Sequence, residues 1–138
     1  MKFHSGNELT TADVKFTFDR LKQSQDFKAI FKPFSGINII DDYTFELVTS
    51  EPYPLLLNTA TYIFPFDSEF YSGQTEDGKD KSAILKHGNS FASENLSGTG
   101  PYTVTERKQG VRVEFERFDD YWDTEAPGNV GKIVLTPI

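Results

Sequence analysis

The stretch Gly98-Thr99-Gly100-Pro101-Tyr102 opens the part of the sequence that decides the fold, which continues through Asp120-Tyr121-Trp122 to Ile133-Val134-Leu135-Thr136-Pro137-Ile138. The two glycines permit backbone angles that are closed to other residues. The proline fixes its own φ and pushes the residue before it toward extended geometry. We therefore expect residues 98–102 to form a structural corner that leads into a strand, with the lining of a ligand cleft as a secondary role.

An antiparallel hairpin is predicted directly after this corner. The chain alternates in polarity from Tyr102 and turns at Lys108-Gln109-Gly110. On the way back, apolar Val111, Val113 and Phe115 alternate with charged residues. Alternation with a period of two is typical of a strand with one buried and one solvent-facing side.

A helix is predicted near the start of the chain, from residue 11 to about residue 23. Thr10 is a suitable N-cap, and Asp13 stands three residues later, as a capping box requires. Three apolar residues then recur at helical spacing on one face, at Val14, Phe18 and Leu21. Such a face is expected to pack against a core.

The middle of the chain predicts smaller elements. Residues 37–40 and 43–48 read as two strands of a hairpin, and residues 55–61 as a short helix. The polar, glycine-bearing residues 72–82 predict a surface loop, and residues 83–87 an added helical turn. Together these elements predict an α+β fold of antiparallel β-hairpins with flanking helices.

Composition narrows the class of protein. The 138 residues suffice for a single domain with one core, and a formal net charge of -7 without clustered Lys and Arg argues against a nucleic-acid partner. No apolar run approaches the roughly 20 residues that span a bilayer. The chain has no cysteine, so a disulfide framework and a thiolate metal site are excluded.

Candidates for catalysis and for metal binding are weak. His4 and His87 are far apart and fit no zinc-binding pattern, and we expect His4 to be a hydrogen-bonded structural residue. The pairs Asp41-Asp42 and Asp119-Asp120 stand at predicted turns, where aspartate bonds its own backbone. Residues 76–80 lack the ligand spacing of a calcium loop. We therefore expect no catalytic residue, no metal and no cofactor, and the chain is not predicted to be an enzyme.

The aromatic pair Tyr121-Trp122 has two interpretations. Such residues after a hairpin usually wrap the edge of a core, with the hydroxyl and the indole N–H near polar partners. They could instead form a platform that stacks against a ligand. We favour the packing interpretation.

Three blocks of the sequence resemble, in the same order, the peptide/nickel class of extracytoplasmic solute-binding proteins, which deliver ligands to ABC importers. The blocks are Phe3-His4-Ser5-Gly6 with Leu9 to Leu21, Asp41-Asp42-Tyr43-Thr44-Phe45-Glu46-Leu47 with Glu51-Pro52-Tyr53-Pro54, and Gly98 to Ile138. Ser5 departs from the pattern, because aspartate is common there in the family. The segment Asp67–Asn95 matches nothing in the pattern.

The resemblance implies that residues 1–138 are one domain, a fragment of the first lobe of a two-lobe periplasmic-binding-protein type II fold. It implies capture of a peptide or other small solute outside the cytoplasm and delivery to ABC permease subunits, with membrane contact only through the permease or a lipid anchor. No signal sequence follows Met1, so the export signal is expected upstream. The ligand-binding residues are unknown because most of the cleft is expected outside this chain.

One alternative function stays open at this point, a free-standing β-rich interaction or adhesion domain.

If the chain is a piece of a lobe, apolar surface that the rest of the lobe covers must face water. We then expect the chain to self-associate. Phe16, on the back of the predicted helix, and the edge of the strand at residues 132–136 are the expected contact surfaces. Phe16 could equally pack locally.

Overall fold

The computed structural model describes residues 1–84 and 90–137. It contains helices and antiparallel sheets, as the α+β prediction requires. The elements, in chain order, are α1 (Thr11–Gln23), β1 (Phe34–Ile39), β2 (Phe45–Thr49), α2 (Leu56–Ala60), α3 (Phe91–Glu94), β3 (Tyr102–Lys108), β4 (Arg112–Arg117) and β5 (Lys132–Leu135).

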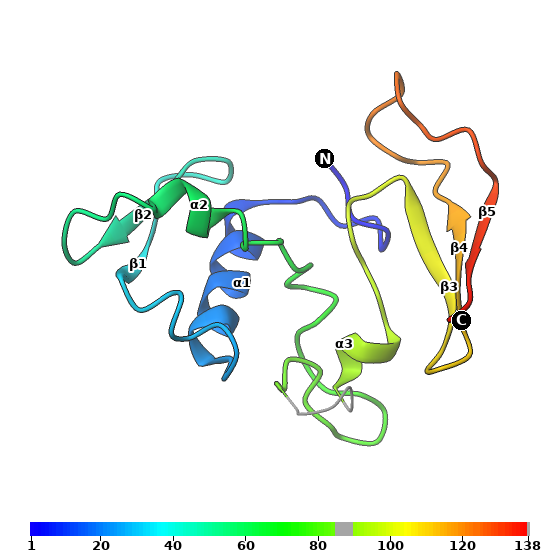
Figure 1. Cartoon of the computed structure of the whole chain (residues 1–138), viewed down its shortest axis with the longest axis horizontal. Helices are drawn as coiled ribbons and strands as arrows, with labels where there is room; N and C mark the ends of the chain where they lie inside the picture. Colours follow the sequence, from blue (N-terminus) through cyan, green and yellow to red (C-terminus); the bar gives the residue numbers. More distant parts are fainter. Residues whose placement is uncertain (85–89, 138) are drawn as a thin grey trace.

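The elements form two groups that lie side by side (Figure 1). Helix α1, the β1–β2 hairpin and α2 make one group, and the β3–β5 sheet makes the other. The N-terminal segment and the chain between α2 and β3 run between them. Among the described residues, no helix packs broadly against the β3–β5 sheet. The connection between the two groups therefore depends on loops and on the contacts that their side chains make.

Helix α1 begins and ends where the sequence predicts. The Asp13 carboxylate accepts a hydrogen bond from the backbone N–H of Thr10 at 2.7 Å, which completes the capping box. The Thr10 hydroxyl also donates to this carboxylate, at 3.2 Å. The β1–β2 turn contributes as well, since the backbone N–H of Thr11 donates to the carbonyl of Asp42 at 2.8 Å. The first turn of α1 thus has partners for its exposed donors.

An aromatic core holds the first group together. Phe18 from α1 meets Phe31 and Phe34 with ring centroids 5.8 and 6.1 Å apart, and all three are almost fully buried. Edge-to-face pairs of this kind add stabilisation beyond the area they bury. The predicted apolar face of α1 is confirmed, because Val14 and Phe18 are buried and Leu21 packs against this core.

The first predicted hairpin forms, although β1 begins three residues earlier than expected. Its register pairs Ile37 with Leu47 and Ile39 with Phe45, which places these four residues on one face. Leu47 packs against the aromatic core. The predicted short helix also forms, as α2. The predicted turn at residues 83–87 lies largely outside the described residues.

The second hairpin matches its prediction and gains a third strand. Strands β3, β4 and β5 pair in that order, all antiparallel, and the turn at Gly110 has a φ of 72°. The register places Val104, Phe115 and Ile133 side by side on one face. On the other face Glu114 accepts ion pairs from Arg112 and Lys132, at 3.0 and 2.6 Å.

The polar segment at residues 72–82 lies on the surface, as predicted. It makes a tight turn closed by a bridge between Gln74 and Asp80. The Thr75 hydroxyl accepts from the backbone N–H of Lys79 at 3.0 Å, and it donates to Asp77 at 2.5 Å. Lys79 and Asp77 also form an ion pair. Those contacts hold the pKa of Asp77 down at about 2.

Candidate functional site

The glycine-rich corner at residues 98–102 is built around His4. The imidazole Nδ1 accepts from the backbone N–H of Gly98 at 3.2 Å, and Nε2 lies 2.8 Å from the carbonyl oxygen of Gly100. The ring therefore carries its proton on Nε2 and donates it to Gly100. Its other side packs on Phe118, with ring centroids 4.9 Å apart. His4 is the hydrogen-bonded structural histidine that the sequence predicts.

The reason proposed for the two glycines of this corner is wrong. Neither Gly98 nor Gly100 has a positive φ, whereas Gly6, Gly110 and Gly128 do. A Cβ on Gly98 would stand 3.7 Å from the His4 ring, which is an ordinary contact. The corner instead uses the backbone groups of these residues, because both carbonyls accept from His4.

A buried carboxylate, Asp67, lies next to this corner, and the sequence analysis does not predict it. Asp67 is fully buried and accepts four hydrogen bonds. The donors are the Ser5 hydroxyl at 2.5 Å, the Asn7 side-chain amide at 2.9 Å, the backbone N–H of Phe70 at 3.0 Å and the Ser97 hydroxyl at 3.0 Å. We call Asp67 and these four donors the Asp67 hub. It joins three segments that are up to 92 residues apart in the chain.

Electrostatics at the Asp67 hub favour the ionised carboxylate. Burial alone raises the pKa of Asp67, but the hydrogen bonds from Asn7, Ser5, Phe70 and Ser97 outweigh burial and lower it. Four donors around one carboxylate satisfy its negative charge without a cation. The only advance signal for such a site is an aspartate inside an aromatic run, between Phe66 and Phe70.

Asp13 has a second role that the capping pattern does not reveal. Its other carboxylate oxygen accepts from the backbone N–H of Ser68 at 2.8 Å, and the neighbouring Thr17 hydroxyl accepts from the N–H of Phe66 at 2.7 Å. Asp13 and Thr17 are both buried. This polar side of α1 therefore holds the segment that carries Asp67.

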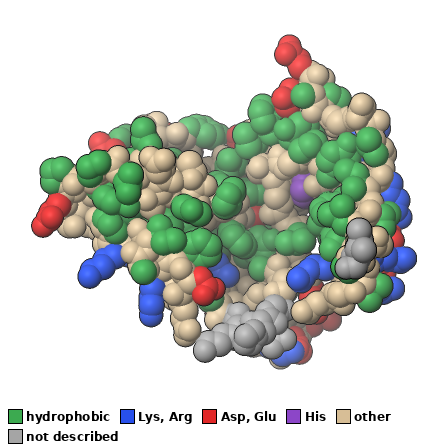
Figure 2. Space-filling model, viewed as in Figure 1, with side chains coloured by type: hydrophobic (Ala, Val, Ile, Leu, Met, Phe, Trp, Pro, Cys, Tyr) green, Lys and Arg blue, Asp and Glu red, His purple; other side chains and the backbone are tan. Residues whose placement is uncertain are grey.

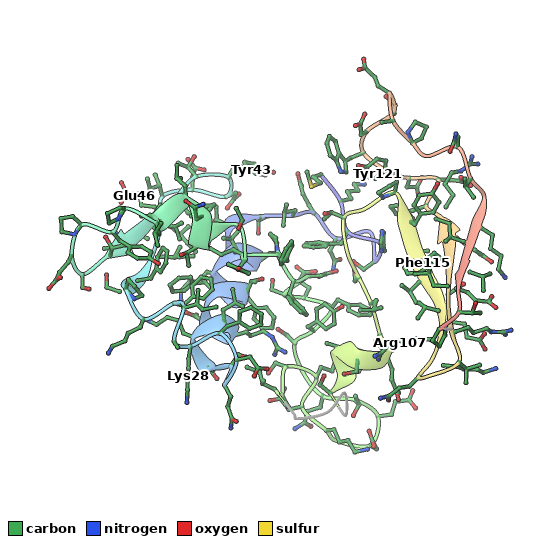
Figure 3. The ribbon with its side chains drawn as sticks, viewed as in Figure 1. Lys28, Tyr43, Glu46, Arg107, Phe115 and Tyr121 are labelled. Carbon is green, nitrogen blue, oxygen red and sulfur yellow. The ribbon has the colours of Figure 1, made fainter. Side chains whose placement is uncertain are left out.

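Two half-buried tyrosines, Tyr102 and Tyr121, have different partners. Tyr102 closes the corner by packing on Gly128, whose φ is 83° and where a Cβ would lie 2.6 Å from the tyrosine hydroxyl oxygen. Tyr121 packs on Trp122 with ring centroids 5.4 Å apart. Trp122 keeps 50% of its surface exposed, so part of this pair faces solvent. Figure 3 shows Tyr121 in the segment beyond β4, above Phe115.

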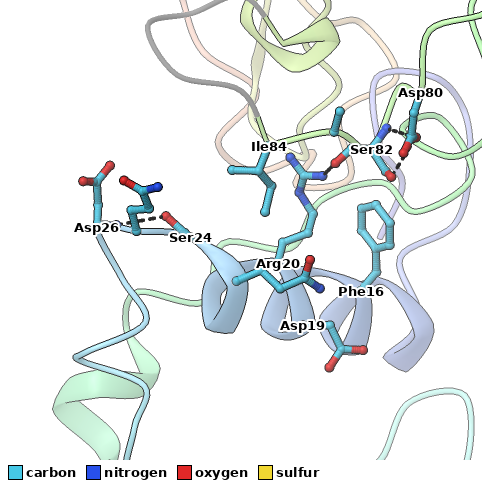
Figure 4. A pocket seen from close by; sticks show the side chains of 11 residues that line it. Phe16, Asp19, Arg20, Ser24, Asp26, Asp80, Ser82 and Ile84 are labelled. Atoms are coloured by element: carbon cyan, nitrogen blue, oxygen red, sulfur yellow. Dashed lines mark hydrogen bonds between the residues drawn. The ribbon is translucent and has the colours of Figure 1, made fainter.

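A cleft lies on the outer side of α1, away from the aromatic core. Its volume is about 720 Å³, and Figure 4 shows its walls. The described lining residues are Phe16, Asp19, Arg20, Gln23, Ser24, Gln25, Asp26, Asp80, Ser82, Ala83 and Ile84. We call this the Arg20 cleft. Phe16, on the back of α1, lines this cleft and is half-buried.

The Arg20 guanidinium is held at the centre of this cleft. Its carbon lies 5.6 Å from the ring centre of Phe16 and 5.4 Å from that of Phe66, and it donates to the carbonyl of Ser82. Burial lowers the pKa of Arg20, against the attraction of Asp80 and Tyr71. The arginine is thus a partly desolvated cation in contact with two aromatic rings.

Within residues 1–84 and 90–137, the side chains of His, Asp and Glu form no group of three or more that could hold a metal ion. Those ranges also contain no helix that is both long and apolar enough to cross a membrane.

The fold is that of ABC transporter substrate-binding proteins. The structure superposes on AppA of Clostridium difficile with a TM-score of 0.76 and 26% identity. The superposition covers 99% of this chain and 27% of AppA. The substrate-binding protein CtaP of Listeria monocytogenes matches with a TM-score of 0.72 at the same identity and coverage. In sequence, the dipeptide-binding protein of Escherichia coli is 26% identical over 99% of this chain.

The chain matches, over residues 1–138, the family of bacterial extracellular solute-binding proteins, family 5 Middle, and it belongs to this family. The resemblance seen in the sequence is thereby confirmed. The chain spans about a quarter of the length of the Escherichia coli protein. The match includes segment 67–95, which shows none of the family motifs quoted above, and this segment contributes Asp67 and Phe70 to the Asp67 hub.

Proposed function

We propose that this chain is part of the first lobe of an extracytoplasmic solute-binding protein that captures peptides or related small solutes and delivers them to the permease of an ABC importer. The observation that supports this most directly is the family match along the whole chain. The same match favours solute binding over a free-standing β-rich interaction or adhesion domain.

The exposed apolar surface supports the assignment to a larger lobe. Figure 2 shows hydrophobic side chains gathered across the middle of one face. Leu57 on α2 is 77% exposed, Phe64 after α2 is 71% exposed, and Leu135 on β5 is 56% exposed. Isolated exposed apolar residues are ordinary, but large ones on both groups of elements indicate surface that further chain would cover. The remaining three quarters of a protein as long as the relatives would supply it.

The proposed mechanism is reversible, non-covalent capture. Two-lobe binding proteins enclose a ligand by hinge closure, so each lobe contributes part of the contact and part of the desolvation. This chain would contribute one rigid wall, because the aromatic core fixes α1 and the Asp67 hub fixes the corner before β3. No chemical step on the ligand and no cofactor are part of the proposal.

The test uses the full-length protein that contains this chain. Isothermal titration against di-, tri- and pentapeptides, a nickel–histidine complex and an oligosaccharide would identify the ligand class. We expect micromolar affinity for at least one peptide and a dissociation constant in the millimolar range or weaker for the isolated 138-residue chain, which corresponds to less than about 4 kcal/mol. A folded full-length protein that binds none of these compounds would overturn the proposal.

A further inference from the structure

The Arg20 cleft holds a cation that forms no direct ion pair among the described residues, although Asp80 lies in the same cleft. Of the four arginines, Arg112 and Arg117 form ion pairs with carboxylates, at distances of 2.5 to 3.1 Å. Arg20 has no carboxylate within 4 Å among the described residues, although the chain has a net charge of -7. The neighbouring residues 85–89 contain no Asp or Glu in their sequence, so they offer no acidic side chain as a partner.

The geometry of the cleft makes this cation accessible and orients it. The guanidinium has five N–H donors, and one described contact, with the Ser82 carbonyl, uses only part of that capacity. The guanidinium carbon also lies within cation–π distance of the rings of Phe16 and Phe66, and these contacts favour its observed position. In Figure 4, Phe16, Arg20 and Ile84 face the same space. A planar, fixed guanidinium binds carboxylates through two parallel hydrogen bonds.

We propose that the Arg20 cleft binds a monocarboxylate that carries an apolar or aromatic group. The carboxylate pairs with Arg20, and the apolar group lies against Phe16 and Ile84, of which Ile84 is 43% exposed. A volume of about 720 Å³ is ample for a ligand of the size of one or two amino-acid residues.

The other charges of the cleft restrict the ligand further. Asp19 is paired with Lys15 at 2.6 Å, but Asp26 and Asp80 also line the cleft and form no ion pair among the described residues. Their negative charge disfavours a second anionic group on the ligand and tolerates a positive one. Monoanions and zwitterions therefore fit, and dicarboxylates do not. The site lies within this chain, so the proposal does not depend on the proposed function of the whole protein.

The test is a titration of the 138-residue chain in which amide and side-chain NMR shifts are recorded at each step. The probes are N-acetyl-phenylalanine, its uncharged amide and the dicarboxylate N-acetyl-aspartate. For the first we expect shifts centred on Phe16, Arg20 and Ile84 and a dissociation constant on the order of 1 mM, as one ion pair and one ring in an open cleft allow. The amide and the dicarboxylate are expected to bind at least tenfold more weakly.

Matched variants separate binding from structure. Arg20→Gln should abolish the shifts, whereas Arg107→Gln should not. Arg107 also donates to a backbone carbonyl, that of Ser93, but it is not among the residues that line the cleft. If Arg20→Gln unfolds the chain, Ile84→Asp replaces it, because Ile84 is partly exposed and its new charge should repel the carboxylate. Equal binding of the acid and the amide, shifts at other residues, or unchanged binding in the folded Arg20 or Ile84 variant would each overturn the proposal.

Discussion

Replacing Asp67 with alanine should destabilise the chain more than any change at a surface carboxylate. The Ser5 and Ser97 hydroxyls can rotate toward other acceptors, but the Asn7 amide and the backbone N–H of Phe70 would lose a fixed acceptor. Each stranded donor costs about 1–3 kcal/mol. Relief of the desolvated charge offsets part of this, so we expect a net loss of about 2–5 kcal/mol.

The loss of unfolding free energy in Asp67→Ala is best measured by urea denaturation of the 138-residue chain, with circular dichroism as the signal. For a domain whose total stability is about 5–15 kcal/mol, this loss moves the midpoint far outside error. Asp67→Asn should cost less, because its amide oxygen still accepts from Asn7 and Phe70. Asp119→Ala is the matched control, because Asp119 pairs with Arg117 while its side chain is 83% exposed. This variant should change the free energy of unfolding by no more than about 0.5 kcal/mol. A loss at Asp67→Ala no larger than this control would refute the reasoning.

Three further predictions follow from named contacts. The pKa of Asp67 in the folded chain lies below its usual 3.8, so the unfolded chain binds that proton more tightly. The free energy of unfolding should therefore fall as the pH drops below about 4. Denaturant melts from about pH 7 to about pH 3 should show a weaker fall in Asp67→Asn. Gly128→Ala should cost about 1–3 kcal/mol in thermal melts, because its Cβ would meet the Tyr102 hydroxyl at 2.6 Å, and an equal loss in the Tyr102→Phe background would contradict that cause. Sedimentation should show self-association that rises with concentration and weakens in Phe16→Glu or Val134→Pro, whereas a monomer at every concentration would exclude these surfaces.

Local patterns in the sequence predicted the elements well. Helix α1 follows from a capping residue and an apolar stripe, and both hairpins follow from alternation bounded by turn residues. These signals lie within a few residues of one another, so one sequence is enough to read them. The glycine pattern of the corner predicts unusual backbone angles that Gly98 and Gly100 do not adopt; the structure uses their carbonyls, which any residue would supply.

The site residues were much harder to predict, because their partners are distant in the chain. Asp67 meets Ser5 across 62 positions, and His4 meets Gly100 across 96. No periodicity connects such residues, and composition gives Asp67 the same expectation as any surface aspartate. Arg20 is similar only in part, because Phe16 lies one helical turn before it on α1, whereas Phe66 comes from a distant segment. A pattern cannot report a contact that only the tertiary fold creates.

The way these contacts are distributed explains how two small groups of elements keep one arrangement. The aromatic core stabilises the α1 group, but no helix covers the sheet, so apolar packing alone does not orient the two groups among the described residues. Hydrogen bonds from His4 to the corner and from Ser5, Asn7 and Ser97 to Asp67 supply the missing constraint. Hydrogen bonds are directional and buried carboxylates tolerate few alternatives, so they select one orientation where apolar contact would allow several. The residues that set the geometry of this wall are therefore polar ones near the chain start and at position 67.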